Sequence, residues 1–117
     1  MRLVNLTPHD LDVYDEAGEK KISTLPRSGE VARVLTQATK VGELEVSNGH
    51  PVPVVETSYG ETENLPECQD GTTYIVSIVV AQAVRGQRDD VVAPDTGPQS
   101  VVRDAKGNIL GVRRFTR

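Results

Sequence analysis

The fold is decided by TYIVSIVVAQAVRGQRDDVVAPDTG, residues 73–97, which contains the longest apolar run of the chain. A run this apolar must be covered on all sides, so it belongs to the core. Ser77 divides the run, and its hydroxyl can cap a helix by accepting from an unpaired amide of the first turn. We therefore predict a β-branched strand before Ser77 and a short helix after it.

Polar residues follow the predicted helix and supply the chemistry of this stretch. Arg85, Arg88, Asp89 and Asp90 precede a Pro-Asp-Thr-Gly turn at residues 94–97. A strand end, an exposed helix start and an arginine-rich loop can together form an anion pocket.

Length and composition bound the remaining possibilities. The 117 residues suffice for one domain, residues 1–117, and the net charge of -4 is spread along the chain. Without a basic block, and with only four aromatic residues, we expect no nucleic-acid polymer as a partner. The single cysteine, Cys68, is expected to be a passive thiol in a reducing cytoplasm. No apolar stretch approaches the ~20 residues of a membrane span, so no membrane partner is expected.

The rest of the chain consists of short apolar segments separated by turns. Eighteen valines favour strands, and Asn48-Gly49 is a strong hairpin signal. The polar segment 58–71 is expected to be a surface loop and a mobile lid. We predict a small, mainly antiparallel α+β domain with one principal helix. Its further strands are expected at residues 1–5, 11–13, 20–25, 30–36, 41–47, 52–57, 100–104 and 109–115.

The first candidate site is the Thr7-Pro8-His9-Asp10 corner. His9 fits two interpretations, a structural histidine bonded to backbone or a histidine that contacts a ligand. The only other histidine is His50, in a different turn, so a multi-histidine metal centre is not expected.

The second candidate site combines Ser28-Gly29 with Arg33. Glycine allows a ligand to approach the backbone closely. Arg33 interrupts an apolar strand, and a charge there needs either an acidic partner or a bound anion. Nine of the 13 basic residues are arginine, which suits an anionic ligand, although a GC-rich genome would give the same bias.

The third candidate site joins the aspartates after the helix to the turn that follows them. Paired aspartates can bind Mg²⁺ or act as acid and base, but in a loop they are usually solvated. The chain has no Walker, GxGxxG, CxxC or GxSxG motif, so no catalytic residue, metal or cofactor is expected. The expected ligand-binding residues are Thr7, His9, Ser28, Gly29, Arg33, Ser77, Arg88, Asp95, Thr96 and Gly97.

An ordered set of motifs resembles a family of small proteins encoded widely in tailed phages, prophages and bacteria. The motifs are NLTPHD, SGEVARV, YIVS followed by a short helix, RDDVVAPDTGP and VRDAKGNILGVRRF, and together they span nearly the whole chain. The resemblance implies a phage context, with the host cytoplasm as the location, but no catalytic residues. Several unrelated small phage folds sequester nucleotide immune signals. The expectation that this chain does the same rests on analogy of context and not on homology.

These observations lead to a functional expectation and two alternatives. We expect a non-enzymatic viral protein that acts in anti-defence as a sponge, binding a phosphate-bearing, nucleotide-derived signal. The alternatives are a phosphodiesterase-like enzyme that uses His9 with loop aspartates, and a structural or protein-inhibitory phage accessory. The long apolar run and the several strand edges also predict a homo-oligomer, most simply a homodimer.

Overall fold

The computed structural model describes residues 1–117, and a four-stranded sheet lies at its centre. The order of its strands is β1 (Arg2–Asn5), β6 (Thr72–Ile75), β7 (Val91–Pro94) and β10 (Phe115–Thr116). The first three strands are parallel, whereas β10 runs antiparallel to β7. Helix α1 (Ile78–Ala83) connects β6 to β7 and packs against β7, as a parallel pair requires a crossover.

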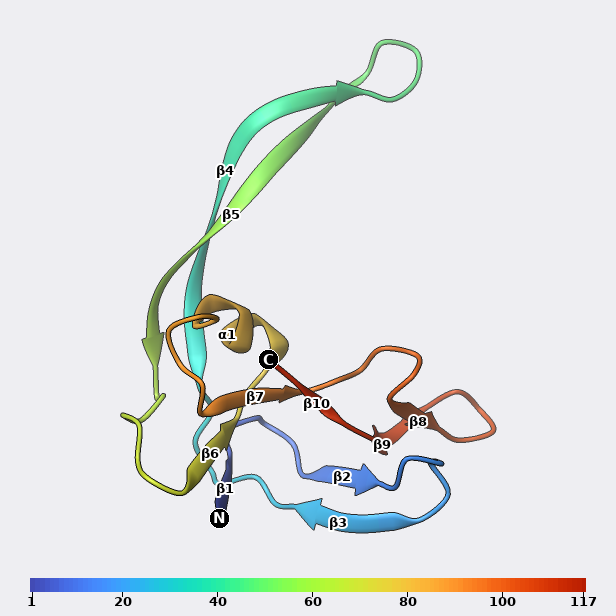
Figure 1. The fold of residues 1–117 in the computed structure, drawn as a ribbon. Helices are drawn as coiled ribbons and strands as arrows, with labels where there is room; N and C mark the ends of the chain where they lie inside the picture. Colours follow the sequence, from blue (N-terminus) through green and yellow to red (C-terminus); the bar gives the residue numbers. More distant parts are fainter.

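A second four-stranded sheet has the order β3 (Lys21–Leu25), β2 (Leu11–Tyr14), β9 (Ile109–Val112) and β8 (Val101–Arg103). It consists of two antiparallel hairpins, β2–β3 and β8–β9. The hairpins are joined by a parallel β2–β9 contact. In this way the second sheet brings the N-terminal corner beside the C-terminal segment (Figure 1).

The third unit is a long hairpin of β4 (Arg33–Glu45) and β5 (Pro51–Glu63), which we call the arm. The arm rises away from the two sheets, which we call the body (Figure 1). The radius of gyration is 17.5 Å, whereas a compact domain of this length has about 13 Å. The arm therefore gives the molecule an extended shape, with principal extents of 53 × 40 × 23 Å.

The hydrophobic core lies between the central sheet, α1 and two flanking loops. Val76, directly after β6, has no exposed surface, and Val80 of α1 is 2 % exposed. Loop residues Leu6 and Ala32 complete the cluster. The predicted division at Ser77 is confirmed, because the Val80 amide donates to the Ser77 hydroxyl at 3.4 Å, where the helix begins. No residue of the arm is buried.

The structure confirms a small, strand-rich domain with one principal helix, but the sheets are mixed and the helix has only six residues. Parallel pairs build the centre of the first sheet, and the antiparallel pairs are β7–β10 and the three hairpins. No helix of the structure is long and apolar enough to traverse a bilayer.

Several predicted boundaries are wrong. The segments 30–36 and 41–47 belong to one strand, β4, and the segment 58–71 is not a loop throughout because β5 continues to Glu63. Strand β7 was missed, since Val91–Pro94 lies between aspartates and a turn and was assigned to a polar loop. The final segment 109–115 contains β9 and the first residue of β10 instead of one strand.

Candidate functional site

The Thr7–Asp10 corner is held by Asn5, a buried polar residue at the end of β1. The Asn5 amide nitrogen donates to the carbonyl oxygens of His9 and Leu25, each at 2.9 Å. The Asn5 side-chain oxygen accepts from the Thr7 amide at 3.0 Å and from the Thr7 hydroxyl at 2.7 Å. One side chain therefore ties the corner to the end of β3, which fixes the position of Thr7.

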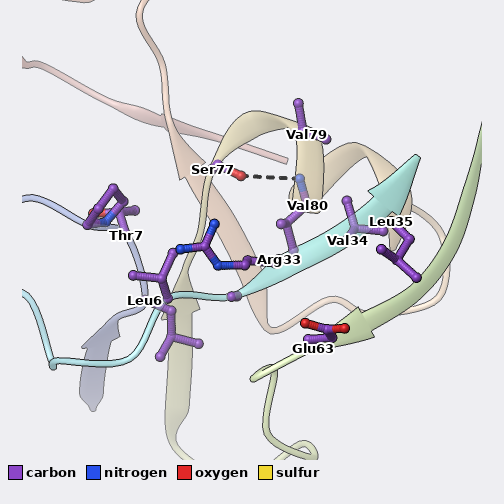
Figure 2. A pocket seen from close by; sticks show the side chains of 12 residues that line it. Leu6, Thr7, Arg33, Val34, Leu35, Glu63, Ser77, Val79 and Val80 are labelled. Atoms are coloured by element: carbon purple, nitrogen blue, oxygen red, sulfur yellow. Dashed lines mark hydrogen bonds between the residues drawn. The ribbon is translucent and has the colours of Figure 1, made fainter. Parts of the chain in front are cut away.

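A cavity of about 400 Å³ opens between this corner, α1 and the base of the arm (Figure 2). We call it the Arg33 cavity. Its volume lies in the range of small-molecule sites, which are mostly apolar with a few polar groups. The lining of the Arg33 cavity is likewise mostly apolar with a few polar groups. The lining residues are Leu6, Thr7, Pro8, Val31, Ala32, Arg33, Val34, Leu35, Glu63, Ser77, Val79 and Val80.

Arg33 is the only cationic side chain that lines this cavity. Arg33 and Glu63 are cross-strand partners at the base of the arm, yet they form no salt bridge. Figure 2 shows the guanidinium turned away from Glu63 and toward the side where Thr7 and Ser77 lie. The five N–H donors of Arg33 make no hydrogen bond within the protein, so they are free for an anion.

The two hydroxyls of the cavity differ in what they can offer. The Thr7 hydroxyl hydrogen is engaged by Asn5 Oδ1, or by the His9 carbonyl at 3.0 Å. The Ser77 oxygen accepts from the Val80 amide and keeps its own hydrogen for a further acceptor. Arg33 and Ser77 are therefore the donors that a ligand in this cavity can use, and Thr7 shapes its wall.

A second cavity of about 420 Å³ lies on the other side of the corner, and we call it the Leu110 groove. Thr7, Pro8 and Ser77 line both cavities. The groove also takes in two more of the predicted residues, His9 and Thr96. Its complete lining is Thr7, Pro8, His9, Asp10, Leu11, Asp12, Ser77, Ile78, Pro94, Thr96, Ile109, Leu110, Gly111 and Val112.

The imidazole of His9 makes no hydrogen bond, and only the His9 backbone takes part in the corner. The interpretation of His9 as a structural histidine whose ring bonds to backbone therefore does not hold in the structure. His9 lines the Leu110 groove and not the Arg33 cavity, so it does not share a cavity with Arg33.

Arg88 does not join Arg33. Its guanidinium is bonded to both carboxylate oxygens of Asp90, at 2.7 and 2.8 Å, and to the Pro66 carbonyl at 2.9 Å. It lines neither cavity but a third one, together with Arg85 and Arg117, so Arg33 and Arg88 do not share a cavity. The cause is the adjacent acid, because a carboxylate two residues away satisfies the arginine locally.

Four further predicted residues serve turns or local contacts. The Ser28 hydroxyl bonds to Glu30, and Gly29 has a φ of 101°, which allows that turn. Asp95 accepts from the Gly97 amide at 2.9 Å and forms a salt bridge with Arg114. None of Ser28, Gly29, Asp95 and Gly97 lines either cavity.

The Arg88–Asp90 pair determines the electrostatics of its neighbourhood. The hydrogen bond from Arg88 lowers the pKa of Asp90, and the same bond raises the pKa of Arg88. Partial desolvation and the Asp90 carboxylate raise the pKa of Cys68. A raised pKa leaves less thiolate, and the thiolate is the nucleophile. Cys68 lies exposed, and this environment does not activate it.

Sequence reasoning missed most of the apolar wall and Glu63. The helix residues Val79 and Val80 were assigned to the core only, although both line the Arg33 cavity. Glu63 was placed in a loop, whereas the hairpin register sets it opposite Arg33. A prediction of one continuous hairpin would have placed Glu63 opposite Arg33.

No group of three or more His, Cys, Asp or Glu side chains is arranged to hold a metal ion. No protein-family model, curated protein or solved structure matched this chain.

Proposed function

We propose that this protein binds a phosphate-bearing small molecule in the Arg33 cavity and withholds it from other proteins. The observation that carries the proposal is the free guanidinium of Arg33, which lines a largely apolar cavity beside a Ser77 hydroxyl. A guanidinium binds phosphate oxygens through two parallel N–H bonds. The apolar wall suits a base or a sugar face, so a nucleotide-derived ligand matches both halves of the cavity.

The finer part of the proposal is the biological context. The resemblance to small phage and prophage proteins supports a counter-defence role, in which a nucleotide-derived immune signal of the host is sequestered. Sequestration, rather than cleavage, is supported by the chemistry of the lining. The Arg33 cavity contains one carboxylate, that of Glu63, and no histidine, cysteine or second acid that could share proton transfer with it.

Arg33→Ala tests the cavity directly. Charge-assisted bonds to phosphate are worth about 1.5–3 kcal/mol, so the variant should bind about tenfold to a hundredfold more weakly. Arg33→Lys should recover only part of the affinity, because lysine keeps the charge but loses the planar fork. Arg117→Ala is the control, since Arg117 lines neither the Arg33 cavity nor the Leu110 groove.

Calorimetry against a panel of linear and cyclic nucleotides would provide the measurement, after mass spectrometry of small molecules that co-purify from infected cells has selected candidates. Equal affinity of wild type and Arg33→Ala would refute the site. The mass of the nucleotide after incubation and denaturation separates the two modes of action. An intact ligand supports a sponge, and a shortened one an enzyme.

Glu63→Gln gives a matched change of opposite sign. The Glu63 carboxylate lines the same cavity and repels an anion, so its neutralisation should tighten phosphate binding while it preserves the side-chain shape. Tighter binding by Glu63→Gln, with weaker binding by Arg33→Ala, would locate the ligand in the Arg33 cavity beside the base of the arm.

A further inference from the structure

Three arginines line one small cavity at the end of α1, which we call the Arg85 cavity. Its volume is about 190 Å³. Arg85 lies in the turn after α1, and Arg117 comes from the segment after β10, which ends beside α1 (Figure 1). The complete lining is Ala81, Arg85, Gly86, Arg88, Val91 and Arg117. None of these residues lines the Arg33 cavity or the Leu110 groove.

The Arg85 cavity combines an apolar floor with a cationic rim. Ala81 of α1 and Val91 of β7 are buried and form its apolar part. No aspartate or glutamate lines the cavity, so its ionisable side chains are all basic. A charged group that is partly shielded from water is screened less by salt than one in open solvent.

Arg88 contributes donors that are already held in position. Its Nε and Nη2 atoms donate to the Asp90 carboxylate and to the Pro66 carbonyl oxygen. Its Nη1 atom makes no hydrogen bond, so two N–H donors remain for a ligand. Because the guanidinium is fixed, these donors bind without the entropy cost of ordering a mobile side chain. Asp90 also balances the charge of Arg88.

Arg85 and Arg117 have no partner within the protein. Neither side chain makes a hydrogen bond or a salt bridge. Capping the end of α1 does not occupy Arg85 either, because the Val84 carbonyl oxygen accepts from the amides of Gln87 and Arg88 at 2.9 and 3.1 Å. Two unbalanced positive charges therefore meet at one cavity, where a bound anion would relieve their repulsion.

Charge and size select the class of anion. A phosphate monoester carries a charge close to -2 at neutral pH, which matches the two unbalanced guanidinium groups. A carboxylate or a phosphodiester carries only -1. The planar forks of arginine also fit phosphate oxygens through paired N–H bonds. The cavity is smaller than the ~300 Å³ at which sites for whole drug-sized molecules begin, so it suits a single phosphate group.

We infer that the Arg85 cavity binds a phosphate dianion, either free orthophosphate or the terminal phosphate group of a monoester. Arg88 supplies the fixed donors, and Arg85 and Arg117 close on the anion from the rim. The inference does not rest on the proposed ligand of the Arg33 cavity, because the two cavities share no lining residue.

Calorimetry with three small probes near pH 7.5 and at low ionic strength tests the class of anion. Wild type and Arg33→Ala should each bind one orthophosphate or one glycerol phosphate per Arg85 cavity, at least tenfold more tightly than dimethyl phosphate. Tighter binding of glycerol phosphate supports a monoester as the source, and tighter binding of orthophosphate supports the free ion. Failure of Arg33→Ala to bind either dianion, or equal affinity for dimethyl phosphate, would overturn the inference.

Substitutions in the rim locate the bound phosphate. Arg85→Ala and Arg117→Ala should each weaken binding about tenfold to a hundredfold, and the double variant should not bind. Arg2→Ala is the matched control, because Arg2 is exposed and lines neither cavity. Its affinity should stay within about twofold of the wild type. Unchanged affinity in both rim variants, or an equal loss in Arg2→Ala, would contradict the site.

The rim variants should fold, since Arg85 and Arg117 are exposed and make no hydrogen bond. Thermal unfolding without phosphate checks this point, and the midpoints should equal that of the wild type. Added orthophosphate should then raise the midpoint of wild type and Arg33→Ala, compared with chloride at equal ionic strength. The midpoint of the double rim variant should not rise. A rise of the same size in that variant would place the phosphate elsewhere and refute the inference.

Discussion

At the scale of single residues, the molecule depends on side chains that satisfy the backbone where elements begin and end. Asn5 bonds the corner through both ends of its amide, and Ser77 caps α1. Asn5 is the last residue of β1 and Ser77 follows β6, so both side chains help to hold the core and the cavity wall in place.

Ser77→Ala should lower the free energy of unfolding by about 1 kcal/mol, since it leaves the Val80 amide without its acceptor. Chemical denaturation would measure the loss. Ser77→Thr, which keeps the hydroxyl, should recover most of the stability. An unchanged midpoint for Ser77→Ala would mean that the 3.4 Å bond contributes nothing to the cap.

The Arg88–Asp90 pair should make stability sensitive to acid. The pKa of Asp90 is lowered in the folded state, so the unfolded chain takes up the proton first as the pH falls. The stabilisation is complete above the ordinary value of 3.8 and is lost as the pH falls through the lower folded pKa. Asp90→Asn should therefore cost about 1.5–3 kcal/mol at pH 7 and less at pH 3.

Denaturation of both proteins between pH 7 and pH 2.5 would check this sign. Asp89→Asn is the control, because the neighbouring carboxylate makes no hydrogen bond. A difference between wild type and Asp90→Asn that stays constant across the pH range would contradict the linkage.

At the scale of elements, local patterns predicted some parts of the fold and failed at others for physical reasons. The strand-cap-helix unit around Ser77 and the short strands β1, β2, β3 and β8 follow from alternation and turn residues. The Asn48-Gly49 turn was found as well. These features depend on neighbours in sequence, which is why a sequence pattern can reveal them.

The missed features depend on pairing between distant segments. Val91–Pro94 is a strand because it pairs with β6 and β10, not because of its own polar surroundings. The polar end of β5 is extended because β4 lies opposite. At the candidate site the sequence indicated Arg33, Thr7 and Ser77, which line one cavity, whereas Arg88 lies outside that cavity and bonds to Asp90.

Two glycines in strands should respond oppositely to alanine. A Cβ at Gly111 would meet the backbone oxygen of Asp12 and approach the Tyr14 ring at 2.9 Å, and backbone cannot move aside. Gly111→Ala should therefore destabilise the β2–β9 contact by about 1–3 kcal/mol. Gly42→Ala meets nothing within 4 Å and should change stability by no more than about 0.5 kcal/mol.

Thermal unfolding of both variants provides the comparison. A large loss in Gly42→Ala would indicate that the arm is packed against another surface at this position. Equal stability of Gly111→Ala and wild type would show that β2 and β9 lie further apart than described.

At the scale of the whole molecule, the body is closed by contacts between segments far apart in sequence. β1 pairs with β6, so Arg2 lies opposite Thr72. The intervening chain includes the whole arm, and closing so long a loop costs entropy before the contact forms. Hairpins such as β4–β5 can form locally, but the central sheet must wait for the chain beyond α1.

The cross-strand pairing of Arg33 with Glu63 makes the arm an insertion whose two ends meet at the surface of the body. Natural variation can therefore lengthen or shorten it without disturbing the buried residues. Removing one pair of opposed residues exchanges its faces, because side chains alternate along a strand, whereas removing two pairs preserves them. The side chains that the outer part of the arm presents can thus change in discrete steps, while Arg33 at the base of the arm and the buried residues of the body keep their places.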